Sequence, residues 1–259
     1  MKRRLPVAVM ATVTGLIVGT IALATSLGTR SQAQSSVTFE PTPLVTLPTA
    51  LPTPTLGAAP QADAQLASLP LFSSDFADAQ SLAAFEFVDL DFVLEGSRGR
   101  WSWRDNALYQ DATEGAGNPS THEIAAYVRD LQVGDGTISL SFYDRSNGVV
   151  GLIARRNGDT YYRYRIIANR YPARPKQVIE KVQDGVVTRL TEIAEPGFDN
   201  YAWHTLSMSV KGNDIVVKLD DTVVAEAYDP TPLPAGQVGV YSRAIGGLLV
   251  DNLVVSAAQ

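Results

Sequence analysis

Residues 151–167 read Gly-Leu-Ile-Ala-Arg-Arg-Asn-Gly-Asp-Thr-Tyr-Tyr-Arg-Tyr-Arg-Ile-Ile, two apolar and aromatic runs on either side of Asn157-Gly158. An Asn-Gly dipeptide takes positive φ angles readily and closes tight turns between antiparallel strands. Because side chains alternate between the two faces of a strand, the second run divides into two sets: Tyr162, Tyr164 and Ile166 on a core face, and Tyr161, Arg163 and Arg165 on the other. The stretch predicts a β-hairpin with one buried face and one exposed face that is basic and aromatic.

The same pattern of short strand-forming runs continues on both sides of this hairpin. Runs rich in β-branched and aromatic residues cover 137–143, 177–182, 186–193, 204–210, 215–219, 238–241 and 248–255. Three further turn dipeptides are each expected to close a hairpin: Asn147-Gly148, Asp184-Gly185 and Gly212-Asn213. Roughly a dozen strands without helical periodicity predict an all-β domain, a jelly-roll sandwich of two antiparallel sheets.

The composition excludes several classes of protein. The chain has 259 residues, of which 45% are hydrophobic and 19% charged, and it has no cysteine. The missing cysteine excludes a disulfide scaffold, thiolate-bound zinc, an iron–sulfur cluster and a cysteine nucleophile. A formal net charge of −6 argues against nucleic acid as a partner, because binding to phosphates needs an excess of Lys and Arg.

The first 70 residues lack the pattern of a folded domain. A basic start at positions 2–4 precedes an uncharged, mostly apolar stretch at 5–27, which is long enough for a helix that spans a bilayer. We therefore expect residues 1–33 to be a signal peptide, or an N-terminal hydrophobic helix that anchors the chain in the membrane if it stays uncleaved. Residues 34–70 hold seven prolines and interleaved threonines, which predicts a disordered Pro/Thr-rich linker. This order predicts a secreted or extracytoplasmic protein.

Residues 71–259 are the predicted sandwich domain, and their positive charge is concentrated in one segment. Outside the first 70 residues the chain keeps 17 basic and 25 acidic residues, and eight of those cations lie between residues 143 and 176. Aromatic rings pack on the apolar faces of pyranoses, and guanidinium groups bond hydroxyls, carboxylates or sulfates. The candidate ligand-binding residues are Tyr143, Arg145, Arg155, Tyr161, Arg163 and Arg165. The alternative is that these arginines pair with acidic residues on neighbouring strands and only solvate a sheet.

The order of several motifs resembles a known superfamily. The motifs are Gly151-Leu-Ile-Ala-Arg155, Tyr161-Tyr-Arg-Tyr-Arg165, Trp203-His-Thr-Leu206, Gly236-Gln-Val-Gly-Val-Tyr241 and Val250-Asp-Asn-Leu-Val254. In this order they are similar to the concanavalin A-like lectin/glucanase superfamily, and more narrowly to laminin-G-like and 3-keto-disaccharide hydrolase-like domains of bacterial surface proteins. The resemblance covers about residues 71–257. It implies a two-sheet sandwich that often presents a glycan site, in a superfamily with both binding modules and hydrolases.

The sequence lacks the catalytic motifs that such hydrolases use. Retaining glucanases of the superfamily carry Glu-x-Asp-x-Glu on one strand, so that all three carboxylates face one cleft. Here the nearest residues are Asp89 and Asp91, which share a face, and Glu86, which lies on the opposite one. Ser97 does not lie in a Gly-x-Ser-x-Gly elbow. We therefore assign no catalytic residue.

Metal ligands are equally sparse. His204 follows a tryptophan into an apolar strand, which favours a structural histidine, and adjacent residues such as His122 and Glu123 point to opposite faces of a strand. Calcium on loop carboxylates stays open, although no calcium-binding motif is present. The carboxylates concerned are Asp220, Asp221 and Asp229.

These features together lead us to expect an extracellular, non-catalytic carbohydrate-binding module displayed from the cell envelope, without a required cofactor. Its partner would be a glycan or polysaccharide, with anionic glycans included, and it would touch the membrane only through the N-terminal segment. Two alternatives stay open: a glycoside hydrolase or lyase of the 3-keto-disaccharide hydrolase type, and a structural or adhesive surface protein.

Overall fold

The structure is a computed structural model, and it describes residues 70–90, 100–111, 123–146, 148–243 and 246–258. The predicted leader at 1–33 and all of the predicted linker except Pro70 lie outside these residues. Within them, no helix is long and apolar enough to cross a membrane.

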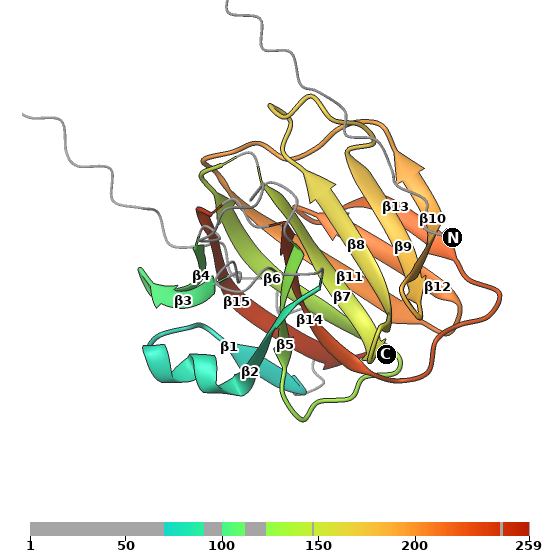
Figure 1. Cartoon of the computed structure of the whole chain (residues 1–259), viewed down its shortest axis with the longest axis horizontal. Coiled ribbons are helices and arrows are strands. Elements are labelled where there is room, and N and C mark those ends of the chain that lie inside the picture. Colours follow the sequence, from blue (N-terminus) through green and yellow to red (C-terminus); the bar gives the residue numbers. More distant parts are fainter. Residues whose placement is uncertain (1–69, 91–99, 112–122, 147, 244–245, 259) are drawn as a thin grey trace, which may run out of the picture. The chain divides into compact units, whose positions relative to one another are not determined.

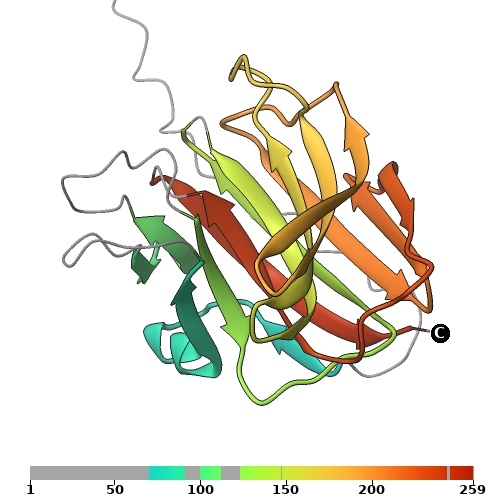
Figure 2. The same cartoon turned by 45° about the vertical axis from the view of Figure 1, so that its right-hand side comes forward.

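Two antiparallel sheets form the described domain and stack face to face (Figures 1 and 2). Sheet A has the order β13 (Thr222–Tyr228), β12 (Asp214–Leu219), β11 (Trp203–Lys211), β6 (Gly136–Asp144), β15 (Leu248–Ala257), β4 (Ala107–Asp111) and β3 (Arg100–Arg104), with β1 (Phe72–Ser74) paired to β15. Sheet B has the order β10 (Val186–Ile193), β9 (Gln177–Gln183), β8 (Thr160–Ile167), β7 (Val149–Asn157), β14 (Gln237–Arg243), β5 (Glu123–Val128) and β2 (Phe85–Asp89). A short 3₁₀ helix, η1 (Ala79–Ala84), precedes β2. The predicted all-β sandwich is confirmed.

Three of the four predicted hairpins are confirmed. The strand pairs β7–β8, β9–β10 and β11–β12 are antiparallel neighbours. Their turns use the residues that tolerate positive φ: Gly158 (58°), Asp184 (49°), Gly185 (78°) and Gly212 (57°). The backbone conformation that each turn needs was therefore readable from the dipeptide alone.

The hairpin predicted at Asn147-Gly148 is wrong, because β6 lies in sheet A and β7 in sheet B. The chain crosses between the sheets here, around the carboxylate of Asp144. This carboxylate accepts hydrogen bonds from the backbone N–H of Ser146 (3.1 Å), the backbone N–H of Gly148 (3.0 Å) and the side-chain amide of Asn200 (3.0 Å). The Asp144 carboxylate therefore stabilises a crossover between the sheets in place of a strand pair.

The core between the sheets contains the side chains of β8 that alternation predicts to be buried. Tyr162, Tyr164 and Ile166 are all buried there. Each tyrosine hydroxyl has a partner, because Tyr162 donates to Asp229 (2.6 Å) and Tyr164 donates to Gln177 (2.8 Å). Burial, followed by the hydrogen bond to Asp229, raises the pKa of Tyr162 to about 12. A buried polar group must be paired in this way if its burial is not to destabilise the fold.

Glycine at position 151 lets β7 and β8 approach closely. A Cβ added at Gly151 would lie 1.9 Å from the carbonyl oxygen of Tyr164. We predict that Gly151→Ala lowers the free energy of unfolding by at least about 1–3 kcal/mol, the usual cost of overpacking. Urea denaturation measures the change. Gly134→Ala is the matched control, since its Cβ would have only Ala235 at 3.6 Å, and equal stability of the two variants would contradict the prediction.

Candidate functional site

The candidate site is the outer face of sheet B, the face directed away from the core and toward the viewer's side of Figure 1. Its centre is a group of charged residues that we call the arginine–glutamate network. The members are Glu123, Arg163, Arg165, Glu180 and Arg243. They come from strands β5, β8, β9 and β14.

Arg163 is the central residue of the network. Its Nε donates to Glu180 (2.9 Å), and one terminal nitrogen donates to Glu123 (2.5 Å). The guanidinium carbon also lies 4.8 Å from the ring centroid of Tyr241, a cation–π contact. The side chain therefore ties together strands that are not neighbours in the sheet.

The reach of Arg163 crosses two strands. Strands β7 and β14 separate β8 from β5, and the residue paired with Arg163 on β7 is Ile153. The guanidinium lies across the outer face between these strands, where only 6% of Arg163 is exposed.

The outer members of the network keep part of their surface in solvent. Arg165 donates to Glu180 (3.2 Å), and its side chain is 11% exposed. Arg243 lies 3.7 Å from Glu123, and its side chain is 30% exposed. These two guanidinium groups carry the donors of the network that a ligand could reach.

The network fixes the charge of Arg163 and Glu180. Burial opposes the charged form of Arg163, but Tyr241, Glu123 and Glu180 outweigh it and raise the pKa of this guanidinium. Burial likewise opposes the charged form of Glu180, but Arg163 and Arg165 hold the pKa of that carboxyl below its ordinary value. The Glu180 carboxylate is therefore ionised at neutral pH and is unsuited to act as a general acid.

A second contact group lies beside the network. The guanidinium of Arg156 lies 4.1 Å from the ring centroid of Tyr127 and donates to Gln237 (2.7 Å). It also reaches Glu86 at 3.5 Å. The Tyr127 hydroxyl has no hydrogen-bond partner among the described residues, and burial raises the pKa of this tyrosine.

The expectation that this face is exposed is wrong. Tyr161 is only 7% exposed and belongs to an apolar cluster on the outer face. The other buried members are Ala125, Tyr127, Val149, Ile153, Ile167, Val182 and Tyr241, with Val88, Leu90, Tyr171 and Ala173 packed against them. Alternation identified the correct face, but it could not show that long side chains would lie flat and that neighbouring segments would cover it.

Only three of the six predicted binding residues, Tyr161, Arg163 and Arg165, lie together on this face. Arg155 lies at the far end of β7, where it is buried and donates to the carbonyls of Gly134 (3.0 Å) and Leu233 (2.9 Å). It also pairs with Asp135 at 2.8 Å. Arg155 therefore holds the segments around Gly134 and Leu233 in place, and it does not line the candidate site.

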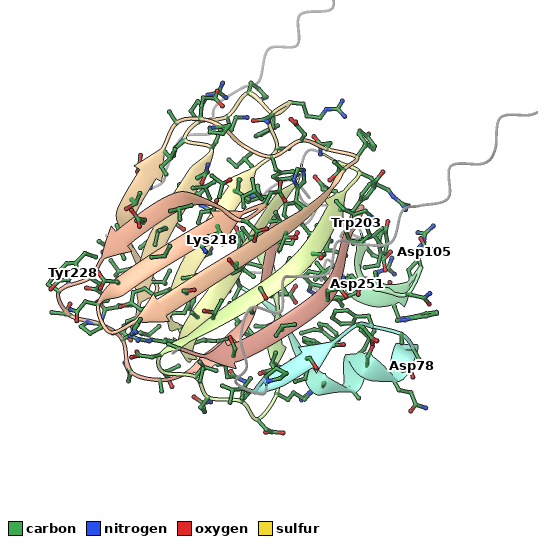
Figure 3. All side chains as sticks on the ribbon, turned by 180° about the vertical axis from the view of Figure 1, so that it is seen from behind. Asp78, Asp105, Trp203, Lys218, Tyr228 and Asp251 are labelled. Atoms are coloured by element: carbon green, nitrogen blue, oxygen red, sulfur yellow. The ribbon has the colours of Figure 1, made fainter. Side chains whose placement is uncertain are left out.

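Tyr143 belongs to β6 of sheet A, and Arg145 directly follows that strand. The ring of Tyr143 packs on Trp203 at 5.6 Å, and Arg145 lies 5.7 Å from the Tyr143 ring centroid. Figure 3 views sheet A from its outer side and labels Trp203, Lys218 and Asp251 on it. These residues form a separate aromatic contact on the opposite side of the sandwich.

Sequence reasoning did not select four residues that contribute to the site. They are Glu123, Glu180, Tyr241 and Arg243. A local pattern could have found Glu180, because it lies in a strand-forming run, where alternation places it on the same face as Val178 and Val182. The other three depend on which strands are neighbours in the sheet, and one sequence does not give that order.

The predicted structural role of His204 is confirmed. Its Nδ1 lies 2.7 Å from Asp220, and its Nε2 lies 2.9 Å from the carbonyl of Asp199. Asp229 is buried against Lys181 at 2.7 Å. Among the described residues, no group of three or more His, Asp or Glu side chains could hold a metal ion. The residues Asp91, Ser97 and His122 lie outside the described part of the chain.

Comparisons with known proteins identify the fold and no family. No family model matches the chain, and no curated protein sequence matches it. A Bacillus subtilis protein described as having a galectin-like fold matches with a TM-score of 0.53 at 11% identity, over 73% of this chain and 96% of that one.

Two further solved structures are more distant. The carbohydrate-binding module CBM66 of Bacillus subtilis has a TM-score of 0.49 at 15% identity, over 66% of this chain and 95% of that one. The β-glucanase of Bacillus licheniformis has a TM-score of 0.44 at 13% identity, over 73% and 98%. The match at a TM-score of 0.53 shows a galectin-like jelly-roll fold, and the narrower resemblance to laminin-G-like or 3-keto-disaccharide hydrolase-like domains stays a prediction.

The lowered pKa of Glu180 predicts a pH dependence of stability. A carboxylate with a folded-state pKa below its unfolded value stabilises the fold above the unfolded value, and this contribution disappears as the pH falls through the folded value. The free energy of unfolding is measured by urea denaturation at a series of pH values from 7 downward. Below pH about 4.5 it should therefore decrease less steeply with falling pH in Glu180→Gln than in wild type. Glu226→Gln, at an exposed position on β13, is the control. An unchanged slope in Glu180→Gln would refute the assignment.

Proposed function

We propose that the outer face of sheet B is a non-catalytic carbohydrate-binding surface. The observation that carries the proposal is the arginine–glutamate network itself, on one face of a galectin-like sandwich, in which Arg165 and Arg243 keep part of their guanidinium groups in solvent. Guanidinium groups donate to the hydroxyls and carboxylates of sugars.

The charge of the network favours anionic glycans. Three arginines face two glutamates, so the network has an excess of one positive charge. Arg165 and Arg243 carry its partly exposed donors. A uronic acid or a sulfate group would pair with one of these partly exposed guanidinium groups.

Binding is favoured over hydrolysis by the state of the carboxylates. Glycoside hydrolysis needs one carboxyl group that stays protonated until it reaches the leaving group. Both Glu123 and Glu180 pair with arginines, and the pKa of Glu180 is lowered. We therefore propose binding without catalysis, by a module displayed outside the cytoplasm on its Pro/Thr-rich linker, and the leader at 1–33 would secrete the chain or hold it on the membrane.

The test is binding of the purified chain to a panel of neutral and anionic polysaccharides, with product release followed in the same samples. We expect binding without products, and we expect the Arg165→Gln/Arg243→Gln double variant to bind at least about tenfold more weakly. Added salt should weaken binding of the anionic members. Arg189→Gln, which removes an exposed arginine of β10 paired with Glu192, is the control.

Three outcomes would contradict the proposal. Equal binding by the double variant and wild type would move the site to another face. Absence of binding across the panel would favour a structural or adhesive role. Release of products would show an enzyme.

A further inference from the structure

A loop at one end of sheet B packs against the candidate site. It connects β8 to β9, and we call residues 168–175 the rim loop; it lies at the upper end of these two strands in Figure 1. Tyr171 and Ala173 of the rim loop pack against the apolar cluster of the outer face. The loop therefore borders the candidate site.

Lys176 follows the rim loop and is completely buried, with 0% of its surface exposed. Its ammonium donates to three carbonyl oxygens of the loop, those of Ala168 (2.8 Å), Asn169 (3.1 Å) and Tyr171. Among the described residues, no carboxylate lies within ion-pair distance of it. An ammonium has three N–H donors, so its hydrogen-bonding capacity is filled entirely by the backbone of one loop.

The backbone of Lys176 is fixed from both sides. Its N–H donates to the carbonyl of Ile193 (2.9 Å), and its carbonyl accepts from the N–H of Ile167 (2.9 Å). The side chain thus starts from an anchored position between β8 and β10 and extends back into the rim loop. Three converging carbonyls are a typical environment for a small cation, and here the cation is covalently attached to the chain.

We propose that Lys176 is a positioning residue whose ammonium serves as a built-in cation that holds the rim loop against the outer face of sheet B. Its role in ligand binding rests on the proposed function, whereas its role in ordering the loop does not. Without the ammonium, three buried carbonyls lose their donor and must turn toward water, which opens the loop. Tyr171 then leaves the apolar cluster, and the binding face loses its rim.

Trypsin cleavage tests the loop directly, because the exposed Arg170 is followed by Tyr171 and is a cleavage site, whereas the bond from Arg174 to Pro175 resists the protease. We expect Lys176→Met to be cleaved after Arg170 at least about tenfold faster than wild type, at unchanged global fold by circular dichroism. Lys218→Met, which replaces an exposed lysine of sheet A, is the control. Cleavage of Lys176→Met at the wild-type rate overturns the proposal.

Chemical rescue separates the ammonium from the packing of its side chain. In Lys176→Ala, ammonium chloride should slow cleavage after Arg170, and tetramethylammonium chloride at equal concentration should not, because it has no N–H group. Equal effects of the two salts overturn the proposal. If the methionine and alanine variants do not fold, Lys176→Gln, which keeps two donors, should be cleaved at an intermediate rate, and wild-type protection in this variant overturns the need for a cation.

Glycan binding by the same variants distinguishes the two proposals. An open rim loop with binding weakened by about tenfold supports both. An open loop with unchanged binding overturns the positioning role. An open loop in a protein whose wild type binds no glycan overturns the proposed function and leaves the loop-ordering role supported.

Discussion

The burial of Arg163 is the constraint on which the rest of the candidate site depends. A buried guanidinium is tolerated only if its charge and its donors are compensated. Glu180 on the neighbouring strand β9 provides part of that compensation, and Glu123 on β5, which two strands separate from β8 on its other side, provides the rest, above the ring of Tyr241. The strand pair that carries this site also depends on Gly151, because a Cβ there would lie 1.9 Å from the carbonyl oxygen of Tyr164. The same strand that presents Arg163 outward places Tyr162 and Tyr164 in the core.

A site built in this way is ordered before any ligand arrives. The charges at its centre neutralise one another, so a ligand gains little from Arg163 itself and must use the donors that remain at the edge of the network, on Arg165 and Arg243. Side chains already held in one conformation lose little entropy on binding. The rim loop adds to this order, since the Lys176 ammonium donates hydrogen bonds to backbone carbonyls of the loop.

The fold was predictable from the sequence where its causes are local. Alternation in 161–167 and turn dipeptides such as Asp184-Gly185 specify strands and hairpins within a few residues. The strand β13 and the strands before residue 130 were not assigned, because short runs interrupted by charged or small residues give little periodicity. At the site, Arg163 and Arg165 were found from alternation, but Glu123 lies 40 residues from Arg163 in the chain and reaches it only through the order of strands in the sheet. The same limit explains the crossover at residue 148, where neighbours in sequence enter different sheets.

Glycan binding at the outer face of sheet B is tested most directly by an NMR titration of the labelled protein with an oligogalacturonate and with a neutral galactan of equal length. The arginine Nε–H signals and the backbone amides report which face the ligand touches. Binding at the outer face of sheet B should shift the signals of Arg165 and Arg243 and of amides along β5, β8, β9 and β14, with larger shifts for the anionic sugar. Shifts confined to β6, β11 and β12 of sheet A, or no shifts with either sugar, would contradict it.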